Sequence, residues 1–209
     1  MPVLAYAVVD QRIQVTAEGV AGAPVVHTET EGLHAWYAHI TTLPKDVQTN
    51  ALGFHAVIGD LFRQTAIVPF RFPTMLADEA ELAAFVRDRR ELFTSDLARL
   101  AGKVQMEVIV ASSAPSAPET GTAYLQGKLD QANLLRESAE RIRMAIGSVA
   151  SESTEREITN GIRLFFLVTR GDVEKFMQAV AECGVRGLRT TGPWPPTAFL
   201  SKELAAAHV

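Results

Sequence analysis

The sequence has very little cysteine: Cys183 is the only one among 209 residues. A single thiol forms no internal disulfide and supplies at most one metal ligand, which excludes disulfide-stapled scaffolds and multi-cysteine metal centres. Proteins without disulfides are typical of a reducing compartment, so we expect a cytoplasmic protein. Cys183 lies at the C-terminal end of a predicted helix, where the helix dipole disfavours a thiolate. We therefore expect it to be a small packed residue and not a nucleophile.

An excess of positive charge is also missing. Twenty Lys and Arg residues stand against 24 Asp and Glu, for a net charge of −4. A nucleic-acid binder needs a basic face to neutralise phosphates, so no nucleic-acid partner is expected. The longest strongly apolar runs, such as residues 164–168, fall far short of the roughly 20 residues that span a bilayer. The first residues carry no positive charge ahead of their apolar stretch, so we expect neither a signal peptide nor a membrane span.

Signatures of catalysis and of metal binding are absent as well. No serine lies in a Gly-x-Ser-x-Gly elbow. The glycine-containing segment 184–189 lies between a predicted helix and a strand, whereas a phosphate loop follows a strand and opens a helix. His27, His34 and His39 are close in sequence, but His34 and His39 are an odd number of residues apart on a predicted strand and face opposite sides. We expect no metal, no cofactor and no enzymatic activity.

The composition that remains is typical of a globular protein, with 47% hydrophobic and 21% charged residues. In the first half, short strand patterns precede two helical ones. The strand around Pro69 reads as an edge strand, with Val68, Phe70 and Phe72 alternating onto one side. Asp78 with Glu81 forms a capping box at the start of the second helix. The predicted strands are 3–9, 25–28, 33–40 and 66–72, and the predicted helices are 45–63 and 78–100.

The second half has the order β-α-β-β-α-β, which is that of a ferredoxin-like fold with helices covering one face of an antiparallel sheet. The first half reads as an altered version whose first helix is missing. We therefore predict an α+β protein of two domains, residues 1–101 and 102–209. In the second half the predicted elements are a strand at 104–110, a loop at 114–118, a helix at 122–146, a hairpin turning at Asn160-Gly161, a return strand at 162–169, a helix at 172–183 and a strand at 185–190.

Two constellations stand out from this pattern. The first is the run Val68 to Thr74, in which Arg71 lies between Phe70 and Phe72. The guanidinium is a planar donor suited to a carboxylate of a partner or of the other domain. Internal pairing is the commoner fate of a structural arginine, so an ion pair that fixes the strand is the alternative.

The second constellation is the run Thr191 to Phe199, which is rich in proline. Pro195 and Pro196 hold the chain extended beside Trp194. A tryptophan in a rigid frame can anchor an interface. In the alternative, Trp194 and Phe199 fold the tail back onto the protein's own core.

Four segments in order resemble the gas vesicle protein F/L family. They are Pro-Phe-Arg-Phe-Pro-Thr at 69–74, the acidic helix start after it, Gly121-Thr-Ala-Tyr-Leu125, and Thr191-Gly-Pro-Trp-Pro-Pro196. His55 is similar to a histidine on the family's first helix. Two positions depart from the family pattern: Pro73 stands where the family usually has glycine, and Thr197-Ala198 replaces Tyr-Ser.

This resemblance implies an accessory protein of gas vesicles with two ferredoxin-like domains and no enzymatic activity. Its implied role is to bind gas vesicle shell protein A, and other gas vesicle accessory proteins besides, during nucleation and to limit aggregation of the shell protein. Such a holder suits a subunit with large apolar faces. The rival interpretation is a small-molecule-binding or enzymatic ferredoxin-like protein, because that fold hosts many functions.

Overall fold

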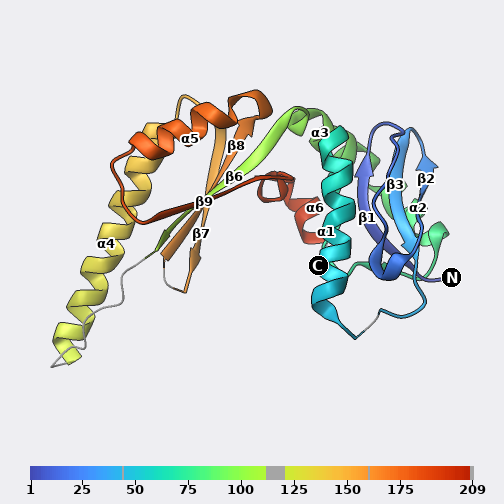
Figure 1. The fold of residues 1–209 in the computed structure, drawn as a ribbon, viewed down its shortest axis with the longest axis horizontal. Helices are drawn as coiled ribbons and strands as arrows, with labels where there is room; N and C mark the ends of the chain where they lie inside the picture. The colour runs from blue at the N-terminus through green and yellow to red at the C-terminus, as the bar shows by residue number, and fades with distance from the viewer. Residues whose placement is uncertain (44, 112–120, 160, 208–209) are drawn as a thin grey trace. The chain divides into compact units, whose positions relative to one another are not determined.

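The computed structural model describes the chain except for residues 44, 112–120, 160 and 208–209. It contains two compact units, one formed by residues 1–102 with the segment from Phe199 onward, the other by Lys103–Ala198 (Figure 1). The sequence placed everything after residue 101 in the second domain. The structure differs, because the buried side chains of Phe199 and Leu204 belong to the first unit. The predicted loop 114–118 and Asn160 of the predicted turn lie outside the described residues.

The first unit is built on an antiparallel sheet in the ferredoxin-like order, β2-β3-β1-β4, with β5 pairing along the same edge as β4. The Glu31-Gly32 turn joins β2 to β3, and both residues have positive φ angles (50° and 83°), as a tight hairpin requires. The short helix η1 (Val20–Gly22) lies in the loop that replaces the missing first helix. The strands are β1 (Val3–Val9), β2 (Val25–Thr30), β3 (Leu33–His39), β4 (Val68–Pro69) and β5 (Met75–Leu76).

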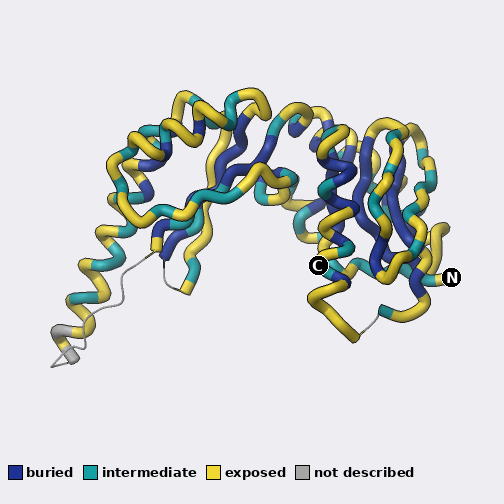
Figure 2. Tube along the Cα trace, in the orientation of Figure 1, coloured by how far each residue is buried: buried dark blue, intermediate teal, exposed yellow. Residues whose placement is uncertain are grey.

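A β-bulge at Tyr6 sets the two faces of β1. Ala5 pairs with Tyr37 and Ala7 with Trp36, so Tyr6 is an extra residue in the strand. Every residue of β1 is fully buried, and Figure 2 shows the strand dark along its whole length. Both faces of this sheet are therefore covered. The reason is that α1 lies against one face while α2 and α3 lie against the other.

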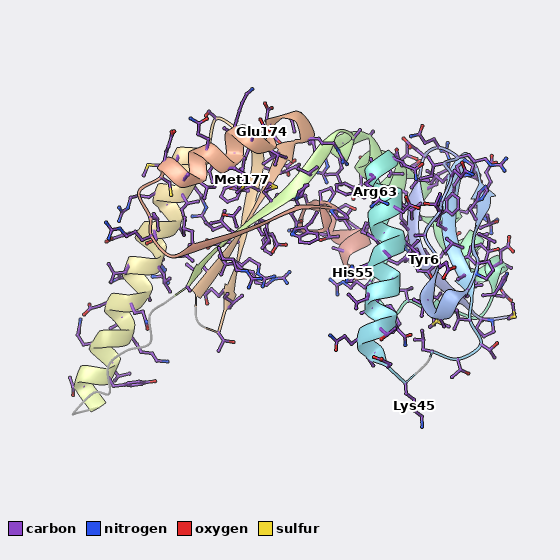
Figure 3. All side chains as sticks on the ribbon, viewed as in Figure 1. Tyr6, Lys45, His55, Arg63, Glu174 and Met177 are labelled. Atoms are coloured by element: carbon purple, nitrogen blue, oxygen red, sulfur yellow. The ribbon has the colours of Figure 1, made fainter. Side chains whose placement is uncertain are left out.

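On the first face, α1 (Val47–Gln64) packs with the loop that replaces the missing helix. The ring of Tyr6, which is labelled in Figure 3, lies 5.1 Å from that of Phe54, and the Tyr6 hydroxyl accepts a 2.9 Å hydrogen bond from the N–H of Val20. A Cβ at Gly19 would lie 2.6 Å from the same hydroxyl, so only glycine fits there. The buried carboxylate of Asp60 fixes the rest of the loop.

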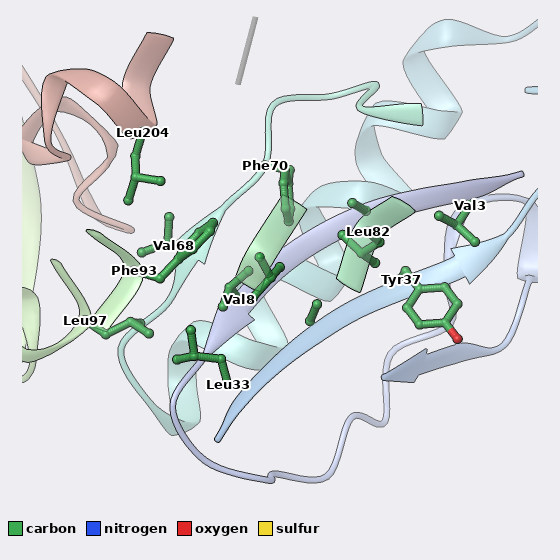
Figure 4. Close-up of a cluster of buried hydrophobic side chains, with 13 residues drawn as sticks. Val3, Val8, Leu33, Tyr37, Val68, Phe70, Leu82, Phe93, Leu97 and Leu204 are labelled. Carbon is green, nitrogen blue, oxygen red and sulfur yellow. The ribbon is translucent and has the colours of Figure 1, made fainter. Parts of the chain in front are cut away.

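On the second face, α2 (Glu79–Asp88) and α3 (Arg90–Leu100) cover a continuous apolar core, and α6 (Lys202–Ala207) adds Leu204 to it. Figure 4 shows Leu82, Phe93 and Leu204 among the side chains of this cluster. The predicted capping box is present: Asp78 accepts from the N–H of Glu81 at 2.9 Å. The predicted single helix is wrong, since the backbone breaks at Arg89 (φ −119°, ψ 19°) with no glycine or proline to mark it.

The strand around Pro69 is also shorter than predicted, though it is an edge strand as expected. Phe70 is buried in the core under α2, with its ring 5.7 Å from that of Phe85. Phe72 instead packs on α1, 5.3 Å from the ring of Phe54. The expected alternation of Phe70 and Phe72 onto one side is therefore wrong, because β4 ends at Pro69 and the chain turns.

The second unit has strand order β7-β8-β6-β9, all antiparallel, with α4 and α5 on one face. This is the predicted ferredoxin-like fold. The Phe166 ring lies 5.5 Å from that of Phe176 at the centre of its core. The elements are β6 (Lys103–Ala111), α4 (Gly121–Ile146), β7 (Ala150–Ile158), β8 (Gly161–Thr169), η2 (Arg170–Asp172), α5 (Val173–Glu182), β9 (Leu188–Trp194) and η3 (Thr197–Phe199), the last of which continues into the first unit at Phe199.

The last strand lies later in the chain than predicted, at 188–194 instead of 185–190. Gly184 and Gly187, both with φ of 73°, delay its start. Near its end the register shifts, and Gly192 (φ 124°) lies so close to β6 that an added Cβ would be 2.8 Å from the carbonyl oxygen of Gln105. Glycine at this position allows a strand to continue through Pro193.

Candidate functional site

Arg71 is exposed and forms no ion pair in the part of the chain that the structure describes. Its carbonyl oxygen accepts a 2.7 Å hydrogen bond from the hydroxyl of Thr74, which closes the turn beneath it. The alternative of an internal ion pair is therefore not found. The geometry leaves the guanidinium facing solvent, where it can donate to a carboxylate of another molecule.

The aromatic residues on either side of Arg71 are structural. Phe70 is a core residue, and Phe72 rests on Phe54 of α1. His55 follows Phe54 on that helix and is exposed, with its ring 6.1 Å from the Phe54 ring (Figure 3). Phe54 thus packs against the side chains of both Phe72 and His55. Of these residues, His55 and Arg71 present polar groups to solvent.

Trp194 ends β9 and is 48% exposed, with its Nε1–H donating to the hydroxyl of Thr191 at 3.3 Å. Phe199 is buried, as is Pro196, and Pro195 is half-buried. The alternative in which both aromatics fold the tail back onto the core therefore describes the buried Phe199 but not the half-exposed Trp194. Trp194 is the last residue of β9, and the buried residues Pro196 and Phe199 come after it.

Two buried polar side chains, Gln105 and Asp96, and the partly buried Arg99 bind the tail on either side of Trp194, and sequence reasoning missed them. In the second unit, Gln105 Oε1 accepts from the N–H of Ala198 at 2.9 Å. In the first unit, Asp96 binds the N–H of Ser201, and Arg99 donates to the carbonyl oxygen of Phe199. The sequence signal that could have found them is a polar residue inside an apolar strand, as for Gln105, or on the apolar face of a helix, as for Asp96.

The Gly121–Leu125 segment opens α4 and lies at its exposed end. Leu125 and Leu129 are 64% and 59% exposed, and Tyr124 is 41% exposed with the Lys128 ammonium 5.3 Å from its ring centre. The predicted apolar face from 125 to 146 is buried only in its C-terminal half, at Ala139, Ile142 and Ile146. Figure 2 shows the first half of α4 largely exposed. We call Tyr124, Leu125 and Leu129 the apolar overhang.

A histidine pair is a further unexpected feature. The His27 ring lies 5.2 Å from His34 and 4.8 Å from Trp36, because all three point to the same face of the β2–β3 hairpin. Burial, followed by the positive charges of His34 and Arg12, lowers the pKa of His27. The Nδ1 of His34 and the Nε1 of Trp36 are buried without a partner. His39 faces the opposite side, as the spacing predicted.

No group of three or more potential metal-ligating side chains occurs among the described residues. Cys183 is half-buried at the end of α5, so its predicted location is found but its burial is incomplete. Among the described helices, none combines the length and the apolarity needed to cross a membrane.

Comparison with known proteins agrees with the fold. The structure resembles that of gas vesicle protein GvpF from Microcystis aeruginosa (TM-score 0.80, 12% identity, covering 96% of this chain and 99% of that one). It also resembles GvpF from Anabaena sp. PCC7120 (TM-score 0.75, 15% identity, 98% and 95% covered). No curated protein matches in sequence. The family model described as gas vesicle synthesis protein GvpL/GvpF matches residues 2–201, and the chain therefore belongs to this family.

Proposed function

We propose that this protein acts in gas vesicle formation by binding the hydrophobic shell protein A directly and keeping it from aggregating before it joins the growing shell. Family membership supports the role in gas vesicle formation. The observation that carries the binding step is the apolar overhang of α4. Under this proposal the protein is an accessory protein and not an enzyme, and it acts in the cytoplasm.

The overhang suits a hydrophobic partner for a simple physical reason. Leu125 and Leu129 are four residues apart, so they lie one above the other on the same side of the helix. The apolar stripe of α4 continues from the buried residues Ala139 and Ile142 into this exposed part. No described residue covers the overhang, so an apolar helix or strand of a partner can pack on it.

The strength of binding must stay moderate, because a holder has to release its subunit. A dissociation constant near micromolar, about −8 kcal/mol, suits that purpose. Three exposed side chains offer far less area than a permanent interface buries, which agrees with transient binding. The exposed Trp194 and Arg71 are further contact candidates, and they lie in different units.

The test is light scattering of the shell protein as it is diluted from denaturant, with and without an equimolar amount of this protein. We expect the wild-type chain to suppress aggregation and the Leu125→Ser/Leu129→Ser variant to lose the effect. A variant with Leu134→Ser and Met144→Ser removes two equally exposed apolar side chains elsewhere on α4 and is the matched control.

The control should suppress aggregation as the wild type does. Circular dichroism of each variant checks that α4 remains helical. Identical aggregation curves with and without the wild-type protein would refute direct holding of the shell protein. Equal loss in both variants would show that the overhang is not the specific contact.

A further inference from the structure

The second unit has one sheet face that α4 and α5 do not cover, and near one end of this face the strands align arginines across the sheet. In the register, Arg156 of β7 lies opposite Arg163 of β8, Arg163 opposite Ile109 of β6, and Ile109 opposite Arg189 of β9. Directly opposed residues share a face. The neighbouring row, with Val108 and Leu164, faces the helices. The arginines therefore project from the helix-free face, and we call these three residues the arginine row.

The positive charge of this row is only partly compensated. Arg163 Nη1 lies 3.6 Å from Glu107 Oε2, and Glu107 also accepts from Gln105. Arg156 and Arg189 are exposed and make no ion pair with any residue that the structure describes. The Nε of Arg163 is buried without a hydrogen-bond partner.

Such an arrangement favours the binding of an anion, although the Arg156 guanidinium also lies 5.8 Å from the centre of the Phe165 ring. Like charges directly opposite each other on neighbouring strands repel, as Arg156 and Arg163 do here. A buried N–H donor without an acceptor costs free energy as well. The remaining acidic residue on this face, Glu152, lies opposite Leu167, two rows away from the arginines.

We propose that the arginine row is a docking site for an acidic segment of a partner protein, whose aspartate or glutamate side chains pair with Arg156, Arg163 and Arg189. The guanidinium fork matches a carboxylate with two parallel hydrogen bonds. Across four strands the row spans about 14 Å, which an extended peptide of about four or five residues covers. Between the charges, the half-buried Ile109 offers apolar contact to a peptide, which a phosphate backbone would not use.

This site is distinct from the overhang of α4, because α4 covers the opposite face of the sheet. The second unit can thus hold an apolar segment on its helix and an acidic segment on its open sheet face at once. Binding of an acidic segment at the arginine row does not require that the shell protein binds the overhang.

The test uses the full-length chain and a labelled synthetic peptide of about ten residues in which glutamate and leucine alternate. Fluorescence anisotropy measures its binding, beside peptides with glutamine or lysine in place of glutamate. We expect binding of the glutamate peptide alone, weakened by added salt. The Arg156→Gln/Arg189→Gln variant should weaken it about tenfold. Both side chains are exposed, so the variant should fold.

The matched control is Arg136→Gln/Arg141→Gln, which removes the same charge from exposed positions of α4. It should bind the glutamate peptide as the wild type does. Equal weakening in the control would reduce the effect to net charge and overturn the site. Absence of binding to the glutamate peptide, or equal binding of the glutamine peptide, would overturn it too. A single-stranded oligonucleotide that displaces the peptide and depends on the same arginines would assign the row to nucleic acid instead.

Discussion

Asp96 Oδ2 of α3 accepts a 2.7 Å hydrogen bond from the backbone N–H of Ser201, a residue 105 positions further along the chain. Its other oxygen pairs with Arg99 at 2.9 Å, and Arg99 in turn donates to the carbonyl oxygen of Phe199. Asp96 is almost fully buried, at 2% exposed. These contacts join the end of the chain to the first unit and allow Leu204 to enter its core.

Replacing Asp96 by alanine should therefore destabilise the first unit. The change leaves the N–H of Ser201 and the partly buried Arg99 without their acceptor, and we expect a loss of about 3 kcal/mol. Chemical denaturation followed by circular dichroism measures it. The control Glu91→Ala removes an exposed carboxylate from the same helix and should change stability by less than about 0.5 kcal/mol. Equal effects of the two substitutions would contradict the assigned role of Asp96.

Asp60 should have a similar role in the loop that replaces the first helix. Its Oδ2 accepts from the N–H groups of Thr16 and Ala17 at 2.7 and 3.0 Å, and Oδ1 pairs with Arg63 at 3.0 Å. Burial raises the pKa of Asp60, but these hydrogen bonds and the Arg63 charge outweigh it, so the pKa lies below its ordinary value. Asp60→Asn should cost about 1–2 kcal/mol near neutral pH.

The sign of the pH dependence follows from that lowered pKa. The folded state favours the ionised carboxylate, so its stabilisation is fully present above the unfolded pKa of about 3.9. It is lost as the pH falls through the lower pKa of the folded state. The stability difference between wild type and Asp60→Asn should therefore shrink when denaturation is repeated below pH 4. A difference that stays constant or grows there would show that the charge of Asp60 is not the stabilising feature.

Phe199 and Trp194 should differ sharply as sites of truncation. Phe199→Ala removes a buried ring and should cost about 3–4 kcal/mol. Trp194→Ala removes a half-exposed ring whose indole N–H donates to the hydroxyl of Thr191, and should cost less than about 1 kcal/mol. Thermal melting of the two variants compares them directly. A larger loss for Trp194→Ala would mean that its ring is buried in solution.

Sequence reasoning succeeded where a local pattern determines a local structure. The order of elements, the capping box at Asp78 and the ferredoxin-like second unit follow from hydrophobic periodicity and from the residues that cap helices and form turns. Seven apolar residues in a row at 3–9 have no period, so the bulge at Tyr6 and the two-sided burial of β1 had no sequence signal. The stripe from Leu125 to Ile146 shows that a period identifies an apolar face but not whether anything covers it. Pairing of Asp96 with Ser201 depends on where the chain end returns, which no local pattern reports.

Arg71→Ala is the last test, because it separates an interface residue from a structural one. The Arg71 side chain is exposed and has no ion pair in the described structure, so the free energy of unfolding should change by less than about 0.5 kcal/mol. Arg99→Ala is the matched comparison: Arg99 pairs with Asp96 and donates to Phe199, so its loss should cost about 2 kcal/mol. Under the proposed function, Arg71→Ala should also weaken capture of the shell protein while melting as the wild type does. If Arg71→Ala lowers the melting temperature as much as Arg99→Ala, the arginine supports the fold and is not a contact for a partner.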